Sequence, residues 1–234
     1  ERWAITDRYA YNETSSPGMV QPPRFPVGDI RLRAAVEIPA AAAAAPAIEA
    51  IVLSRGHEFR AVIDGPAVKL QMRPAPPDQG SEAQAAWVDL AQGAISPLRP
   101  GTVTEIEFWH NDQQLELWIE NRRVAHGTYS WTPAQRLAFA TGRTNEAIFR
   151  SDIPSGRQLS DPSIYRASSA AWAFGGGPVT LHRLGLDRDI YYRPDFRHGV
   201  PGLPPAWATH PTTTMNLGPD QFFACGDNSP SSED

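Results

Sequence analysis

The segment TEIEFWHND, residues 104–112, brings two glutamates, a tryptophan and a histidine close together in the chain. Glu105 and Glu107 are two residues apart, so on a β-strand their side chains would share one face, roughly 6–7 Å apart. A pair of carboxylates about 5–5.5 Å apart is the arrangement that a retaining glycosidase uses. The segment therefore indicates either the hydrolysis of a glycosidic bond or an exposed strand face whose acids are balanced by arginines.

The surrounding sequence, Thr102 to Tyr129, predicts a three-stranded meander that would position these side chains. Apolar residues alternate with polar ones, and the meander turns at Asn111-Asp112 and at Asn121-Arg122. Alternation places Trp109 and Trp118 on the polar face, together with the two glutamates. Exposed tryptophans can stack on sugar rings or anchor a protein partner, so these four residues are the candidate ligand-binding set. The alternative is a second layer of structure that covers this face.

The rest of the chain is rich in proline and glycine and shows few helical patterns, whereas period-two alternation is common. We expect an all-β sandwich. A short helix or a strand is predicted over Ala83–Leu90, and a long surface excursion over Gly142–Ala170. The other predicted strands are Asp29–Ile38, Ile48–Ser54, Glu58–Ile63, Ala67–Met72, Arg136–Gly142 and Val179–Tyr192.

The hairpin with LELWIENRRVA and the late strand LHRLGLDRDIYY resemble concanavalin-like jelly rolls of the lectin and laminin-G type. The resemblance implies an antiparallel jelly-roll sandwich over residues 1–193, followed by a proline-rich linker over residues 194–211. It also implies a glycan or protein ligand, and it leaves a calcium ion open as a cofactor, although no loop has diagnostic spacing. Laminarinase-type hydrolases of this fold carry Glu-x-Asp-x-x-Glu, but here Glu107 replaces the aspartate and His110 stands at the third acid.

The bulk composition excludes several classes of function. A net charge of −5 argues against a protein that binds nucleic acid electrostatically. The six histidines show no metal-ligand spacing, so no metal site is predicted. No apolar stretch reaches the ~18–20 residues that a membrane span needs. The chain starts at Glu1 rather than at methionine, which suggests a fragment of a longer protein.

The last segment, LGPDQFFACGDNSPSSED, resembles the final signature segment of the bacterial signal peptidase I family. In that family a strand ends in Gly-Asp-Asn, and Ser-x-Asp-Ser-Arg follows three residues later. The resemblance implies that Ser232 would hydrogen-bond the catalytic lysine and that Asp234 would pair with the following arginine. The matching residues are Gly226, Asp227, Asn228, Ser232 and Asp234, within a predicted peptidase segment over residues 212–234.

The resemblance to signal peptidases predicts a parent with a Ser/Lys dyad, anchored in the membrane, that removes signal peptides from preproteins. Its place would be the extracytoplasmic face of the bacterial cytoplasmic membrane, and the sandwich would be an insert. This chain lacks both the Ser-Met-x-Pro nucleophile segment and a matching lysine segment, since Lys69 lies in AVKLQMRP. We therefore expect no catalytic residue in this chain and no peptidase activity of its own. The alternative is a free-standing lectin-like module.

Overall fold

The computed structural model describes residues 5–6, 25–42, 45–76, 85–144, 161–188 and 218–219. The chain divides into two compact units, the first of which comprises Glu1–Thr6 and Phe25–Asp189. The second comprises Asp7–Arg24 and Ile190–Asp234. Only residues 218–219 of the second unit are described, so the fold below is that of the first unit.

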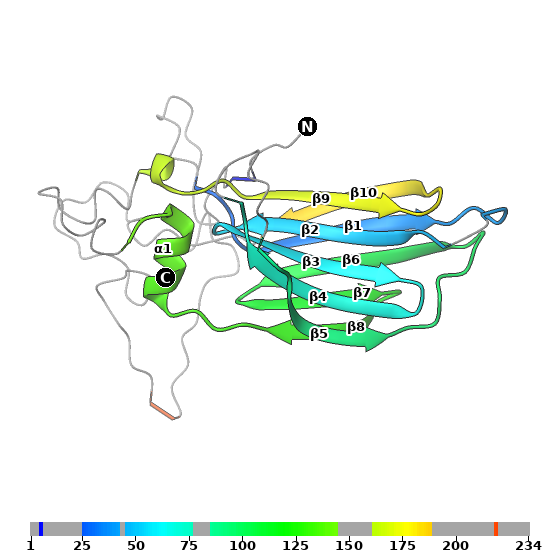
Figure 1. The fold of residues 1–234 in the computed structure, drawn as a ribbon, viewed down its shortest axis with the longest axis horizontal. Helices are drawn as coiled ribbons and strands as arrows, with labels where there is room; N and C mark the ends of the chain where they lie inside the picture. Colours follow the sequence, from blue (N-terminus) through cyan, green and yellow to red (C-terminus); the bar gives the residue numbers. More distant parts are fainter. Residues whose placement is uncertain are drawn as a thin grey trace, which may run out of the picture. The chain divides into compact units, whose positions relative to one another are not determined.

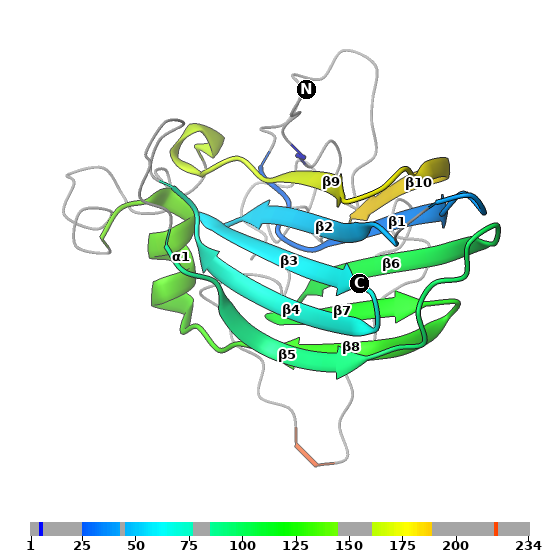
Figure 2. The same ribbon diagram turned by 45° about the vertical axis from the view of Figure 1, so that its right-hand side comes forward.

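The first unit is a sandwich of two five-stranded sheets, and all strand pairs are antiparallel (Figures 1 and 2). Sheet I has the order β10 (Thr180–Arg188), β1 (Ile30–Glu37), β6 (Val103–Asn111), β7 (Gln114–Ile119) and β8 (Arg122–Thr128). Sheet II has the order β5 (Val88–Ala94), β4 (Ala67–Pro74), β3 (His57–Asp64), β2 (Ala47–Ser54) and β9 (Ser169–Gly175). The predicted fold class, an all-β antiparallel jelly-roll sandwich of the concanavalin type, is confirmed.

The core lies between the two sheets because every second residue of each strand points inward. Such alternation buries apolar side chains from both layers while the opposite faces stay polar. The inward residues include Phe108, Leu115 and Leu117 of sheet I and Phe59 and Leu70 of sheet II, all of them completely buried. The predicted inward face of β1 is also confirmed, with Ile30, Leu32, Ala34 and Val36 buried.

Tight two-residue turns join the strands of the meander. Asp112 and Gln113 connect β6 to β7 with φ of 44° and 64°, and Glu120 and Asn121 connect β7 to β8 with φ of 49° and 58°. Positive φ at both central residues is the type I′ geometry, whose twist matches that of the flanking strands. The three predicted strands are therefore correct, with each turn displaced by one residue from its predicted pair.

The predicted strand over Arg136–Gly142 is wrong, because the structure has helix α1 (Pro133–Thr141) there. Thr132 accepts a hydrogen bond from the backbone N–H of Gln135, and the Gln135 side chain bonds back to the backbone of Thr132. This capping box, with proline at the first turn and Gly142 in the left-handed conformation after the last, specifies a helix. Leu137 and Phe139 alternate with polar or small residues as they would in a strand, but the capping signals favour the helix.

Two further elements differ from the prediction. The structure has a strand, β5, where the sequence left helix and strand open, and it begins five residues later at Val88. Strand β9 had no counterpart among the predicted strands, since its sequence SAAWAFG is dominated by small residues. No helix in the described ranges is both long and apolar enough to cross a membrane. The predicted linker, residues 194–211, lies outside the described residues.

Candidate functional site

The outward face of sheet I carries the four ligand-binding residues that the sequence predicted. Glu105, Glu107 and Trp109 alternate along β6 with the buried Ile106 and Phe108. Strand register then places Trp118 of β7 directly opposite Glu107. The structure therefore brings all four candidates together on one face, and both tryptophans are partly exposed there.

Each tryptophan on this face is tied to a carboxylate of its own strand. The Trp109 indole N–H donates to Glu107 Oε2 at 2.8 Å, and the Trp118 indole N–H donates to Glu116 Oε2, also at 2.8 Å. The two rings are neighbours, with centroids 5.9 Å apart and planes tilted by 33°. These bonds fix the orientation of both indoles without covering them, which produces a preformed aromatic platform.

Arginines from the adjacent strands frame the platform. The Arg31 guanidinium lies 5.0 Å from the centroid of Trp109, and the Arg123 guanidinium lies 6.0 Å from that of Trp118. Arg123 also bonds Glu116 Oε1 at 2.8 Å, and Arg31 lies 3.8 Å from Glu107. The platform thus has guanidinium donors and carboxylate acceptors on both sides, which are the groups that bind hydroxyls and other polar atoms strongly.

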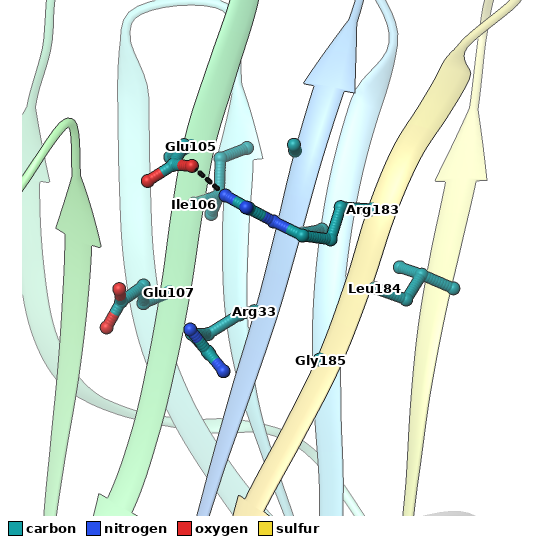
Figure 3. A pocket seen from close by; sticks show the side chains of 9 residues that line it. Arg33, Glu105, Ile106, Glu107, Arg183, Leu184 and Gly185 are labelled. Atoms are coloured by element: carbon teal, nitrogen blue, oxygen red, sulfur yellow. Dashed lines mark hydrogen bonds and ion pairs between the residues drawn. The ribbon is translucent and has the colours of Figure 1, made fainter.

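A shallow hollow of about 70 Å³ adjoins the platform on the side of β1 and β10 (Figure 3). Two small residues leave it open, Ala35 of β1 and Gly185 of β10, and charged side chains surround it. Figure 3 shows the Arg183 side chain reaching across β1 to Glu105, with which it forms an ion pair. Arg33 lines the hollow as well and contacts Asp187 Oδ2 at 2.9 Å.

An irregularity in β10 shapes this edge of the site. Ala35 pairs with Arg183, but Val36 pairs with Leu181, so His182 is an extra residue on β10. A β-bulge of this kind redirects side chains locally. Here His182 contacts Glu37 Oε2 at 2.7 Å and Arg183 contacts Glu105. Two consecutive side chains of β10 therefore reach carboxylates of the neighbouring strands.

The geometry does not favour acid–base catalysis by Glu105 and Glu107. A general acid is usually buried in an apolar site. Glu105 is instead partly exposed and paired with Arg183, while Glu107 accepts the Trp109 indole N–H and lies near Arg31. Both carboxylates are therefore engaged by neighbouring side chains of the same face. The third acid position of a hydrolase is occupied by His110, whose side chain is buried on the opposite face of β6.

The described residues contain no group of three or more His, Cys, Asp or Glu side chains that could hold a metal ion. His110 is occupied in the core, where Nδ1 donates to the Gly28 carbonyl at 2.6 Å and Nε2 accepts from the Tyr129 hydroxyl at 2.7 Å. His57 lies among aromatic rings, 4.6 Å from both Trp131 and Phe139. Both histidines are therefore structural.

The arginines of the site are the residues that sequence reasoning missed. Arg31 and Arg33 alternate with the buried Ile30 and Leu32, so their outward direction could be read from the sequence. Their position beside β6 follows from long-range pairing, which no local pattern reveals. The peptidase motif, Gly226, Asp227, Asn228, Ser232 and Asp234, lies outside the described residues.

A third tryptophan, Trp87, lies one residue before β5 and packs on arginines of sheet II. Trp87 lies under two guanidiniums, those of Arg60 at 4.0 Å and Arg73 at 4.2 Å from the ring centroid. Arg60 is bonded to Glu49 and Arg73 to Glu58. Trp87 therefore belongs to a separate ion-pair network on the other layer, and it offers a matched control for the tryptophans of sheet I.

No protein-family model matches the chain, and no curated protein matches it. Among solved structures, sheep galectin-11 in complex with glycerol is similar with a TM-score of 0.36 and 7% identity, covering 68% of this chain and 89% of that one. Carbohydrate-binding module CBM66 from Bacillus subtilis has a TM-score of 0.38 and 8% identity over 68% of this chain and 75% of that one. Alginate lyase PA1167 from Pseudomonas aeruginosa has a TM-score of 0.33 and 12% identity, covering 81% of this chain and 88% of that one. The fold assignment rests on the sheet topology described above.

Proposed function

We propose that the sandwich is a lectin-like binding module whose outward face of sheet I binds a glycan. The observation that carries the proposal is the platform of Trp109 and Trp118, partly exposed and flanked by fixed carboxylates and guanidiniums. A sugar ring presents apolar C–H groups on its faces and hydroxyls around its edge. Aromatic rings pack against the C–H groups, and charged side chains form hydrogen bonds with the hydroxyls.

Calorimetric titration with a panel of oligosaccharides tests this function. We expect Trp109→Ala and Trp118→Ala each to weaken binding roughly tenfold, because each removes a ring that would stack on the sugar. Trp87→Ala is the matched control and should bind like the wild type, since Trp87 packs on arginines of sheet II rather than on the platform. Failure of the wild type to bind any glycan, or equal binding by all four proteins, would contradict the proposal.

We also propose, from the terminal sequence alone, that residues 212–234 are the last signature segment of a signal peptidase. The support is the motif Gly226-Asp227-Asn228 with Ser232 and Asp234 at the family spacing, after an apolar strand-like run. Residues 1–193 would then be an inserted sandwich and residues 194–211 its linker. The parent would be membrane-anchored, would act on preproteins at the extracytoplasmic face, and would supply the Ser/Lys dyad.

The reading frame on both sides of the chain tests this second proposal. Ser-Arg directly after Asp234, with a membrane span, a Ser-Met-x-Pro segment and a lysine segment before Glu1, would support it. A stop codon directly after Asp234 would contradict it. The two proposals concern different parts of the chain, so glycan binding by the sandwich can be measured whichever result the reading frame gives.

A further inference from the structure

The tryptophan platform has an internal two-fold symmetry. Strands β6 and β7 are antiparallel, and their register sets Glu107 opposite Trp118 and Trp109 opposite Glu116. Both strands carry the same pattern, Glu-x-Trp, at Glu107–Trp109 and at Glu116–Trp118. A half-turn about an axis perpendicular to the sheet, between β6 and β7, therefore exchanges the two tryptophans and the two glutamates.

The contacts repeat under the same half-turn. The two indole-to-carboxylate bonds have the same length, 2.8 Å. The outer strands also correspond, because β1 flanks β6 and β8 flanks β7. Arg31 pairs with Trp109 in register, and Arg123 pairs with Trp118 in register. Each arginine lies near the tryptophan beside it and near the glutamate bonded to that tryptophan. Each half of the platform thus has one Arg, one Trp and one Glu in the same register. The arginine contacts differ in detail, because Arg123 bonds Glu116 at 2.8 Å, whereas Arg31 lies 3.8 Å from Glu107 and bonds Asp187 at 2.7 Å.

The symmetry is limited to this centre. The half-turn brings Arg33 of β1 onto His126 of β8, and the pairing of β7 with β8 has a register shift between Leu117 and Trp118 that the pairing of β6 with β1 does not have. The charges of the centre are also paired, since Arg123 bonds Glu116, while Arg31 bonds Asp187 and lies near Glu107. A charged ligand would have to displace one of these partners and would leave the other unpaired, which carries a cost.

From this arrangement, and on the basis of the proposed glycan-binding function, we infer the ligand class and how it binds. The platform consists of two half-sites that share the same tryptophan and glutamate arrangement, one built on Trp109 and one on Trp118. Its ligand is an uncharged linear homo-oligosaccharide of two or more pyranose units. Because the half-sites are related by a two-fold axis, as in a self-complementary surface, a chain that runs in one direction meets the same groups as one that runs in the other. The ligand therefore binds in both directions.

Calorimetry and NMR together test the inference. The panel is cellohexaose, xylohexaose, mannohexaose and laminarihexaose as uncharged chains, with hexaguluronate as the charged comparison. For the uncharged chain that binds best, we expect Trp109→Ala and Trp118→Ala to lose affinity by factors within about threefold of each other, near tenfold each. Trp→Phe at either position should recover most of the loss, and Trp87→Ala should change nothing. Thermal denaturation of each variant checks that the fold is kept.

The direction of the bound chain is read with a spin label attached to the reducing end of that same oligosaccharide. Binding in both directions should broaden the amide signals of Gly185 on β10 and of His126 on β8 together, since these strands lie on opposite sides of the platform. Broadening on one side alone, strongly unequal losses, or tighter binding of hexaguluronate would each overturn the inference while leaving glycan binding intact. A wild-type protein that binds none of these sugars or other glycans would overturn the proposed function and this inference with it.

Discussion

His110 shows how one residue type can suggest chemistry in the sequence and serve packing in the fold. It lies beside Glu105 and Glu107 in the chain, yet alternation along β6 turns it into the core, where it is fully buried. Its two ring nitrogens are engaged by the Gly28 carbonyl and the Tyr129 hydroxyl, which fixes the neutral tautomer with the proton on Nδ1. Burial lowers the pKa of His110 to about 4.

This shifted pKa predicts a loss of stability in mild acid. Between the unfolded pKa of 6.5 and the folded value of about 4, the unfolded chain binds a proton at His110 that the folded chain does not. The free energy of unfolding should therefore fall as the pH is lowered, by about 2 kcal/mol between pH 7 and pH 5 from this residue. Burial also lowers the pKa of His57, which adds to the fall in the same direction.

Urea denaturation at a series of pH values measures the loss. His110→Gln removes the titrating group while keeping a side chain that can donate and accept hydrogen bonds, so its stability should depend less on pH over this range. An NMR titration of the folded wild type supplies an independent measurement. A His110 ring that titrates near its ordinary pKa in the folded protein would show that the expectation is wrong.

At the scale of elements, the sequence predicts strands better than it predicts their partners. Period-two alternation located β1 to β4, the meander of β6 to β8, and β10, because a half-covered strand must alternate. It also put the candidate glutamates and tryptophans on one face. The framing arginines come from β1, β8 and β10, and only register brings them to the site. Helix α1 could have been predicted from its capping box, Thr132 to Gln135.

The edge strands β5 and β8 approach each other closely, and glycine makes this possible. A Cβ on Gly127 of β8 would lie 3.0–3.2 Å from the side chain and backbone of Leu90 in β5. Gly93 of β5 is similarly confined by Val68 and by the Val124 carbonyl. Since the obstructing atoms include backbone, an added methyl group cannot be accommodated by rotating one side chain.

We therefore expect Gly127→Ala to destabilise the sandwich by about 1–3 kcal/mol, as overpacking does. Gly175→Ala is the matched control, because a Cβ there would meet nothing within 4 Å. That variant should differ from the wild type by no more than about 0.5 kcal/mol. Chemical denaturation of the three proteins gives the comparison, and equal stabilities for both variants would refute the role assigned to the close approach.

At the scale of the whole sandwich, the two edges differ. The β5 and β8 strands pack closely around Gly127, although Val88 at the start of β5 is exposed, whereas β10 at the other edge exposes three leucines, Leu181, Leu184 and Leu186. Leu184 and Leu186 of β10 are opposite Ala34 and Leu32 of β1, so they share the inward-facing side, yet they are 57% and 46% exposed. The core is therefore centred on the inner strands and thins out toward β10.

This asymmetry predicts that two leucines paired in register contribute differently to stability. Leu32 is only 3% exposed, and Leu32→Ala should lower the free energy of unfolding by about 2–5 kcal/mol because it leaves a cavity in the packed core. Leu186 lies opposite it on the adjacent strand, but Leu186→Ala removes a side chain that keeps much of its contact with water. Its cost should stay below about 1 kcal/mol, since burial free energy scales with the apolar area removed from water. Urea denaturation of the two variants decides the point: equal costs would mean that the inward side of β10 is as well packed in solution as that of β1.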